Sequence, residues 1–207
     1  MHIGSNRVPN GMQDHVTQPI YDSRRVDVAP YGVELFCTPI GQRDPGARGD
    51  ERTSEDTNMY LASQLPQGNE FYITQIGVYF VPNIEARASS WRDDAADTLR
   101  VLGCGFLEFR VMNRIYLRLA PLAALPPGFP MYWAHDEAKL SQLLLPTVVE
   151  GESVHKVPDA PGFKITPIYI AAGQGFGVSI HSKERFALHN PGRLGVILYG
   201  QLIREIQ

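Results

Sequence analysis

The sequence has few cysteines, little clustered charge and no long apolar run. Cys37 and Cys104 are the only cysteines in 207 residues, too few for a disulfide framework. They leave open one bridge or two free thiols, and a reducing compartment favours free thiols. The formal net charge is −3, so no overall basic field exists to attract nucleic acid or anionic lipid. Arg24-Arg25 is the one adjacent basic pair. Direct nucleic-acid contact is therefore not expected.

Targeting and membrane signals are also missing. The start, MHIGSNRVPNGMQDH, lacks the apolar segment of a signal peptide. The most apolar stretch, Leu117 to Phe129, is interrupted by Pro121, Pro126 and Pro127 and is too short to span a bilayer. We therefore expect a soluble protein that is made without secretion and has no membrane partner.

Catalytic motifs are absent or lack their context. The sequence contains no phosphate-binding loop, dinucleotide fingerprint, nucleophile elbow or Cys-His zinc spacing. Ser153-Val154-His155-Lys156 matches the S-x-x-K pattern of acyl-transferring enzymes, in which Ser and Lys lie one helical turn apart. Here the tetrad lies between Gly151 and Pro158, a poor place for a helix, and the companion motifs are missing. We interpret it as a chance match.

Metal binding is not indicated either. His181, Glu184 and His189 lie in one region, but a cupin-type site needs two histidines one residue apart and a following Glu. His135, Asp136 and Glu137 are typical of a helix start that favours acids. The sequence therefore predicts no metal, no cofactor and no catalytic residue, and we expect a protein that is not an enzyme.

Three further features have structural interpretations. Arg48-Gly49-Asp50 lies in a loop of polar composition, residues 41–58, and we interpret it as part of a solvent-exposed loop. Asp93, Asp94 and Asp97 crowd the first turns of a predicted helix, where acids complement the helix dipole. Five aromatic residues are candidates for a sugar platform of the kind found in β-sandwich lectins: Trp91, Trp133, Tyr116, Tyr132 and Tyr169. Carbohydrate binding stays open as an alternative function.

What the sequence does contain is period-two patterning, the mark of strands with one buried face. An apolar fraction of 43% and this length suit one folded domain, since all-β domains run to ~200–250 residues. Residues 107–111 and 115–119 predict a hairpin with Glu108, Arg110 and Arg118 on its wet face. The other predicted strands are residues 31–39, 70–81, 164–171, 176–181 and 193–207. A phase change in residues 70–81 predicts a β-bulge beside Gly77.

Helices are expected only in connections. Residues 90–102 predict one, capped by Ser90, with Ala95, Leu99 and Leu102 on its apolar side. A second short helix is predicted over residues 136–144. The fold class is therefore mainly β: an antiparallel, jelly-roll-like β-sandwich with one or two short helices.

The N-terminal segment differs from the rest of the chain. Residues 1–30 are polar, contain Gly, Pro and Asn at close intervals and show little periodicity. We expect an extended N-terminal arm over residues 1–30 and a single sandwich domain over residues 31–207. Such an arm is ordered by what it lies against, either a neighbouring subunit or its own domain.

Three stretches carry a resemblance to a known class of protein: LASQLPQGNEFYITQIGVYFVP (61–82), FLEFRVMNRIYLRLAPLAALPPG (106–128) and FGVSIHSKERFALHNPGRLGVILYGQLIREIQ (176–207). The hairpin followed by a PL…LPPG connection, and a last strand of the form GxLxRxxQ, resemble virion structural proteins of bacteriophages with a jelly-roll fold. These are capsid-building or capsid-decorating (cement) subunits. The resemblance covers about half of the chain.

The resemblance implies many identical copies, no chemistry, and a place in the virion. The partners would be other copies of the chain and other capsid proteins, contacted through the arm and the loops at residues 41–58, 83–90 and 120–135. We therefore expect a homo-oligomeric virion protein. The alternative is a carbohydrate- or receptor-binding sandwich of a phage tail or spike.

Overall fold

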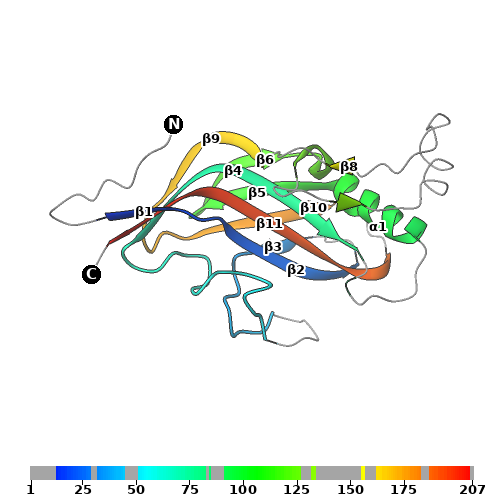
Figure 1. The fold of residues 1–207 in the computed structure, drawn as a ribbon, viewed down its shortest axis with the longest axis horizontal. Coiled ribbons are helices and arrows are strands. Elements are labelled where there is room, and N and C mark those ends of the chain that lie inside the picture. Colours follow the sequence, from blue (N-terminus) through cyan, green and yellow to red (C-terminus); the bar gives the residue numbers. More distant parts are fainter. Residues whose placement is uncertain are drawn as a thin grey trace.

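The computed structural model describes residues 13–28, 32–44, 51–82, 84, 91–126, 132–133, 155–156, 162–182 and 187–205. They form two facing β-sheets, a small two-stranded sheet and one α-helix (Figure 1). The elements in chain order are β1 (Gln13–Thr17), β2 (Ile20–Val28), β3 (Val33–Leu35), β4 (Asn69–Val81), α1 (Trp91–Cys104), β5 (Gly105–Val111), β6 (Arg114–Leu119), a 3-10 turn η1 (Leu122–Ala124), β7 (Tyr132–Trp133), β8 (His155–Lys156), β9 (Phe163–Ile170), β10 (Phe176–Ser182) and β11 (Ala187–Glu205).

Strand pairing defines the topology. The first sheet has the order β1-β11-β4-β9, and β2 also pairs with β11, further along the same edge; the second has the order β3-β10-β5-β6. The pairs β2–β11, β3–β10, β4–β9 and β5–β6 are nested and all antiparallel. This nesting results when one long hairpin is rolled into two layers, which is the jelly roll. The predicted antiparallel, jelly-roll-like sandwich is confirmed.

The core lies between the inner faces of the two sheets. From the first sheet it contains Phe71, Ile73, Val78, Phe80, Ile170, Leu194, Val196 and Leu198, and from the second Leu107, Phe109, Val111, Phe176, Val178 and Ile180. Inward positions recur at every second residue along each strand, and some of the residues between them, such as Glu108 and Ser179, are also buried, by contacts on the outer face. The strand predicted over residues 176–181 is confirmed as β10, with Phe176, Val178 and Ile180 facing the core.

Half of the expected arm belongs to the sandwich. Residues 13–17 and 20–28 are strands β1 and β2, and Gln13 pairs with Glu205 at the end of β11. Residues 29–31, where the arm was expected to meet the domain, lie outside the described residues. Residues 1–12 lie outside the described residues. What orders residues 13–28 is therefore the chain's own sheet.

Two strand predictions need correction. The bulge of β4 lies at Thr74 rather than beside Gly77, because Ile73 and Gln75 pair with successive residues Gly200 and Tyr199. The apolar phase changes at this extra residue. The predicted first strand, residues 31–39, is shortened to β3 because Phe36 has a φ of 68° and turns the chain out of extended conformation.

Helix α1 confirms the prediction for residues 90–102 in position, and Leu102 packs against the core as predicted, but the predicted apolar side is wrong at Leu99. Leu99, predicted on the apolar side, is 62% exposed, whereas Asp97 and Val101 are buried. The buried acid faces β11 and is described below. The helix predicted at residues 136–144 lies outside the described residues. No helix in the described part of the chain is long and apolar enough to cross a membrane.

Candidate functional site

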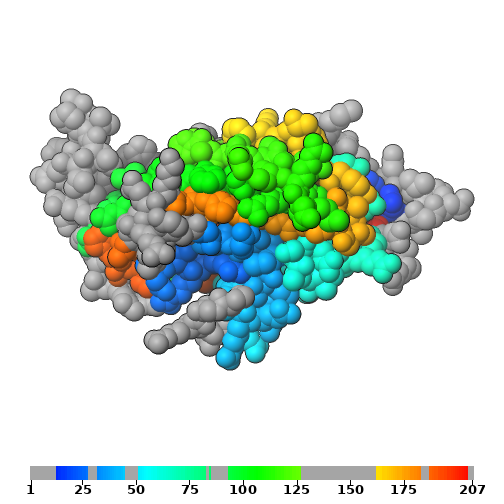
Figure 2. Space-filling model, turned by 180° about the vertical axis from the view of Figure 1, so that it is seen from behind, coloured from blue at the N-terminus to red at the C-terminus, as the bar shows by residue number. Residues whose placement is uncertain are grey.

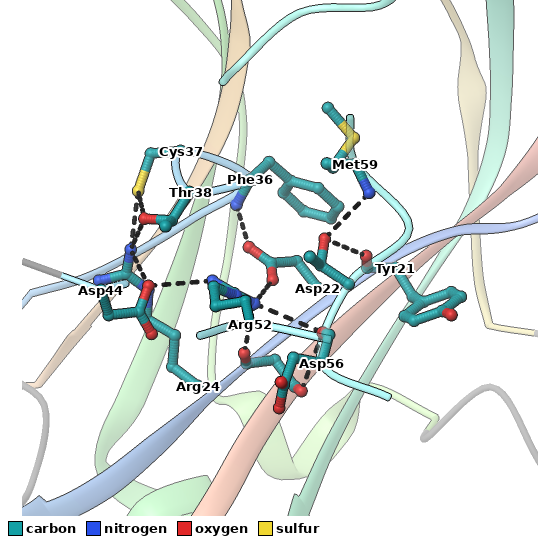
Figure 3. Close-up of polar contacts among 12 residues, drawn as sticks. Tyr21, Asp22, Arg24, Phe36, Cys37, Thr38, Asp44, Arg52, Asp56 and Met59 are labelled. Atoms are coloured by element: carbon teal, nitrogen blue, oxygen red, sulfur yellow. Dashed lines mark hydrogen bonds and ion pairs between the residues drawn. The ribbon is translucent and has the colours of Figure 1, made fainter. Parts of the chain in front are cut away.

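Asp22 and Arg52 form a buried ion pair between β2 and the β3–β4 connection (Figure 3). Asp22 lies on the inward row of β2 with no exposed surface, and Arg52 is 4% exposed. The Arg52 Nη2 atom donates to the Asp22 carboxylate and, at 2.7 Å, to the carbonyl of Ser23. The backbone N–H of Phe36 donates to the other Asp22 oxygen. The pair therefore holds a residue of the connection against the edge of the sandwich.

A second arginine extends this network. Arg24 Nη2 lies 3.1 Å from Asp44 Oδ1 and donates to Cys37 Sγ and Thr38 Oγ1, each at 2.9 Å. Asp44 also contacts Arg52 Nη1 at 3.1 Å. We call the six residues of this network the polar clamp: Asp22, Arg24, Cys37, Thr38, Asp44 and Arg52. At this edge of the core, β2 and the β3–β4 connection are held together by hydrogen bonds and ion pairs rather than by apolar contacts.

Alternation along β2 separates the adjacent basic pair. Arg24 turns into the polar clamp, with 16% of its side chain exposed, while Arg25 faces outward beside Asp27 at 3.2 Å. The two arginines therefore lie on opposite faces of the strand. They do not make a joint basic patch.

Burial also affects the ionisation of Asp22. Loss of solvent raises the pKa of the Asp22 carboxyl from 3.8 to about 6, against the opposing effects of Arg52 and of the Phe36 N–H. The carboxyl thus titrates in mildly acidic solution. A proton taken up by Asp22 would therefore change a buried ion pair of the polar clamp.

The connection also covers the free edge of β2. The Ser23 N–H donates to the Asp56 carbonyl at 2.8 Å, and the Asn58 N–H donates to the Tyr21 carbonyl at 3.3 Å. The Asn58 side-chain oxygen accepts from the Tyr21 N–H at 3.0 Å. Residues 56–58 therefore satisfy backbone groups that an edge strand leaves unpaired.

Beyond this edge the connection exposes two large apolar residues. Met59 and Leu65 are buried, but Tyr60 is 74% and Leu61 is 39% exposed. Backbone hydrogen bonds fix the segment, since Ile40 N–H donates to the Met59 carbonyl and Ser63 N–H to the Phe36 carbonyl. Tyr60 and Leu61 are therefore exposed on ordered backbone.

The turn between β5 and β6 lies beside the same segment. Met112, which is 65% exposed, donates its N–H to the Gly175 carbonyl, and the next residue, Phe176, donates to the Ser63 carbonyl at 2.7 Å. In Figure 2 the cyan surface of the β3–β4 connection adjoins the orange surface that includes the β9–β10 turn. We call Tyr60, Leu61 and Met112 the tip patch. The name denotes three exposed apolar residues on neighbouring segments, and exposed apolar surface that is contiguous marks protein interaction sites.

The outer face of the second sheet holds a charged network. Glu108, only 6% exposed, contacts Arg118 Nε at 2.6 Å and Arg110 Nη2 at 3.0 Å. Hydrogen bonds from Arg110 and Arg118 lower the pKa of Glu108, although its burial opposes them. The prediction that Glu and Arg face each other across this hairpin is confirmed. Because two arginines neutralise the Glu108 carboxylate, we interpret the network as one that stabilises the sheet.

His181 lies next to that network and His189 is elsewhere. His181 Nε2 is 3.8 Å from a Glu108 oxygen, and its ring stacks on Phe106 at 5.1 Å. His189 Nδ1 is 2.9 Å from Asp97 on α1. Glu184, the third residue of the metal candidate, lies outside the described residues. The described residues contain no group of three or more His, Cys, Asp or Glu that would hold a metal ion.

Asp97 joins α1 to β11. Its carboxylate accepts the backbone N–H groups of His189 at 2.9 Å and Asn190 at 3.2 Å. Asp93 and Asp94 occupy the first turn of the helix, as predicted for acids at a helix N-terminus. Asp97 differs from them because it is buried and its hydrogen bonds connect α1 to β11.

Several candidates lie outside the described residues: Arg48-Gly49-Asp50, His135, Asp136, Glu137 and Ser153. His155 and Lys156 form β8, so that end of the S-x-x-K tetrad is a strand rather than a helix. The arrangement that S-x-x-K chemistry needs is therefore not present at its second half. Cys37 and Cys104 are free thiols.

The five aromatic residues proposed as a platform are spread over separate elements. Tyr116 is on β6 in the second sheet and Tyr169 is on β9 in the first. Trp91 begins α1, and Tyr132 and Trp133 form β7. The structure instead pairs Tyr169 with Tyr72, a residue that the sequence reading did not select.

Sequence reading also missed the polar clamp and the tip patch. The alternating order of IYDSRRVDV would place Asp22 and Arg24 on one side of a strand, and that was the available signal. Comparison of the chain with protein-family models, curated proteins and solved structures finds no match.

Proposed function

We propose that this chain is a non-enzymatic structural protein of a bacteriophage virion that assembles into or onto the capsid, as a shell or cement subunit. The jelly-roll topology supports the proposal, because viral capsid subunits use it. Lectins and cupins share the architecture, so the fold alone does not select the function. The choice among these functions depends on which residues the sandwich exposes on its surface.

The tip patch is the observation that carries the proposal. A subunit that packs against copies of itself benefits from apolar contacts on backbone that is already ordered, because less conformational entropy is lost on binding. Tyr60 and Leu61 meet this condition, since the polar clamp and the backbone bonds of residues 59–63 fix their segment. Met112 adds apolar surface from the second sheet.

The test is whether the purified chain assembles through the tip patch. We expect the wild-type chain to form symmetric oligomers or shells, seen by sedimentation velocity and electron microscopy. The double variant Tyr60→Ser/Leu61→Ser should remain monomeric and retain the circular dichroism spectrum of the wild type. Leu99→Ser removes an apolar side chain of α1 that is 62% exposed, between the values for Tyr60 and Leu61; it is the matched control and should assemble normally.

Two results would contradict the proposal. One is a wild-type chain that stays monomeric both alone and when mixed with particles that lack it. The other is a tip-patch variant that assembles as well as the Leu99→Ser control.

A further inference from the structure

Two exposed tyrosines form a pair on the outer face of the first sheet. Tyr72 of β4 is paired in register with Tyr169 of β9, and their ring centroids are 4.8 Å apart at an interplanar angle of 40°. The two residues are 40% and 41% exposed. Tyr72 is also paired with Gln201 of β11 on the same face. The pair is therefore an aromatic surface supported by three adjacent strands.

A shallow cavity lies beside this pair. It has a volume of about 250 Å³ and is lined by Gln13, Gln67, Gly68, Glu70, Ala172 and Ile203. Glu70 precedes Tyr72 by two residues and so points to the same face of β4. A hydrogen bond to Glu70 raises the pKa of the Tyr169 hydroxyl, so Glu70 joins the cavity to the aromatic pair.

The residue types at this place define a ligand class. Among the described residues the lining contains amides and one carboxylate and no Lys or Arg, so these residues offer nothing to neutralise an anion. A carboxylate with free lone pairs accepts hydrogen bonds strongly, and Gln side chains both donate and accept. The tyrosine rings supply flat apolar surface with a polar hydroxyl. A ligand with one apolar face and many hydroxyl groups satisfies all three features.

We propose that the Tyr72–Tyr169 pair and the adjacent cavity bind a neutral saccharide. One sugar ring would lie against the tyrosine surface, and its hydroxyl groups would donate to Glu70 and exchange hydrogen bonds with Gln13 and Gln67. This site is separate from the tip patch, and the proposal does not depend on assembly into a capsid.

An organic ammonium ion is the competing ligand, because aromatic rings and a carboxylate also attract cations. The amide N–H groups of Gln13 and Gln67 favour a polyol, because sugar hydroxyl oxygens accept hydrogen bonds and an ammonium ion does not. Glu70→Gln separates the two ligands. It retains a hydrogen-bond acceptor for a sugar but removes the charge that a cation needs.

The experiment screens the full chain on an array of neutral glycans and repeats it with charged glycans and with choline as a soluble probe. We expect binding to at least one neutral glycan. Tyr72→Ala should weaken that binding by about tenfold, and Tyr72→Phe should retain most of it, because stacking survives without the hydroxyl. Tyr116→Ala, which removes a similarly exposed tyrosine from the opposite sheet, should leave binding unchanged.

Three outcomes would overturn the proposal: no neutral glycan is bound, glycan binding is unaffected by both Tyr72→Ala and Tyr169→Ala, or choline binds and is lost in Glu70→Gln while glycans do not bind. None of these outcomes changes the assembly measured with the tip-patch variants. The two proposals therefore fail separately.

Discussion

The carboxylate of Asp22 is ion-paired with Arg52, a residue from a different segment, inside the edge of a β-sandwich. The edge strand carries a charge on its inward face, where its neighbours β11 and β4 carry Val196 and Val78. The pair is satisfied by further hydrogen bonds, which is the condition under which a buried ion pair is tolerated. The β3–β4 connection thereby becomes part of the folded edge.

Arg52→Met should destabilise the protein strongly. Removal of Arg52 takes the main counter-charge from the buried Asp22 carboxyl, which then stays charged without compensation or takes up a proton, at a cost of about 3–5 kcal/mol in the free energy of unfolding. Arg43→Ala, an exposed arginine of the same connection, should change the free energy of unfolding by less than about 0.5 kcal/mol. Urea denaturation of both variants measures the difference. Equal effects would show that the polar clamp adds nothing to stability.

Stability should also depend on pH through Asp22. Because the pKa of Asp22 is raised to about 6, the folded protein binds this proton more tightly than the unfolded chain does. The stabilisation from protonated Asp22 is complete below about pH 4 and is lost as the pH rises through about 6. Relative to Asp22→Asn, the wild type should lose on the order of 3 kcal/mol between about pH 4 and pH 7. Denaturation of both proteins at several pH values checks this.

The opposite trend would be informative. If the wild type gained stability over Asp22→Asn as the pH rose, attraction to Arg52 and Arg24 would outweigh the cost of burial. The pKa of Asp22 would then lie below its ordinary value.

Gly200→Ala should disturb the bulge of β4. A methyl group at Gly200 would overlap the carbonyl oxygen of Tyr72, a backbone atom that cannot move without disturbing the strand pair. We expect a loss of about 1–3 kcal/mol or more in the free energy of unfolding, measured by thermal denaturation. Gly103→Ala, at a helical position with open space around it, should be neutral or slightly stabilising. A well-folded Gly200→Ala variant of normal stability would refute the role given to this glycine.

Two truncations separate the N-terminal segment from the sandwich. A chain that starts at Gln13 retains every described strand and should keep the melting temperature of the full chain. A chain that starts at Tyr31 lacks β1 and β2, leaves one edge of β11 unpaired and removes Asp22, so it should not fold. Circular dichroism and thermal melting distinguish them. Cooperative folding of the shorter chain would mean that the sandwich begins at residue 31, as the sequence had predicted.

Local alternation made most of the strands predictable. The β5–β6 hairpin alternates cleanly, because Leu107 and Phe109 face the core while Glu108 faces Arg118 across the strands. The orientation of α1 was not predictable in this way. Its buried face includes Asp97, whose carboxylate accepts hydrogen bonds from backbone groups of β11. Because periodicity assigns only apolar residues to the buried face, it does not predict that an acid is buried there.

The candidate sites depend on register rather than on local pattern. Tyr72 is recognisable in the sequence as an outward residue of its strand, but its proximity to Tyr169 follows only once β4 and β9 are paired. Likewise Arg52 belongs to a segment of loop composition, and nothing near it in the sequence indicates burial. Propensity and periodicity predict local structure, and they do not predict which remote segments come into contact.

The nested strand pairs have a consequence for how the chain reaches its fold. The inner pair β5–β6 closes over a two-residue turn, but Ile20 of β2 meets Leu198 of β11 across almost the whole sequence. Each outer pair closes a longer loop, and such non-local topologies fold slowly. During synthesis β2 emerges long before β11, so its unpaired edge stays exposed while most of the chain is still being made. The pairing of β2 with β11 therefore completes only after the last strand has been made, and we expect slow folding of the chain.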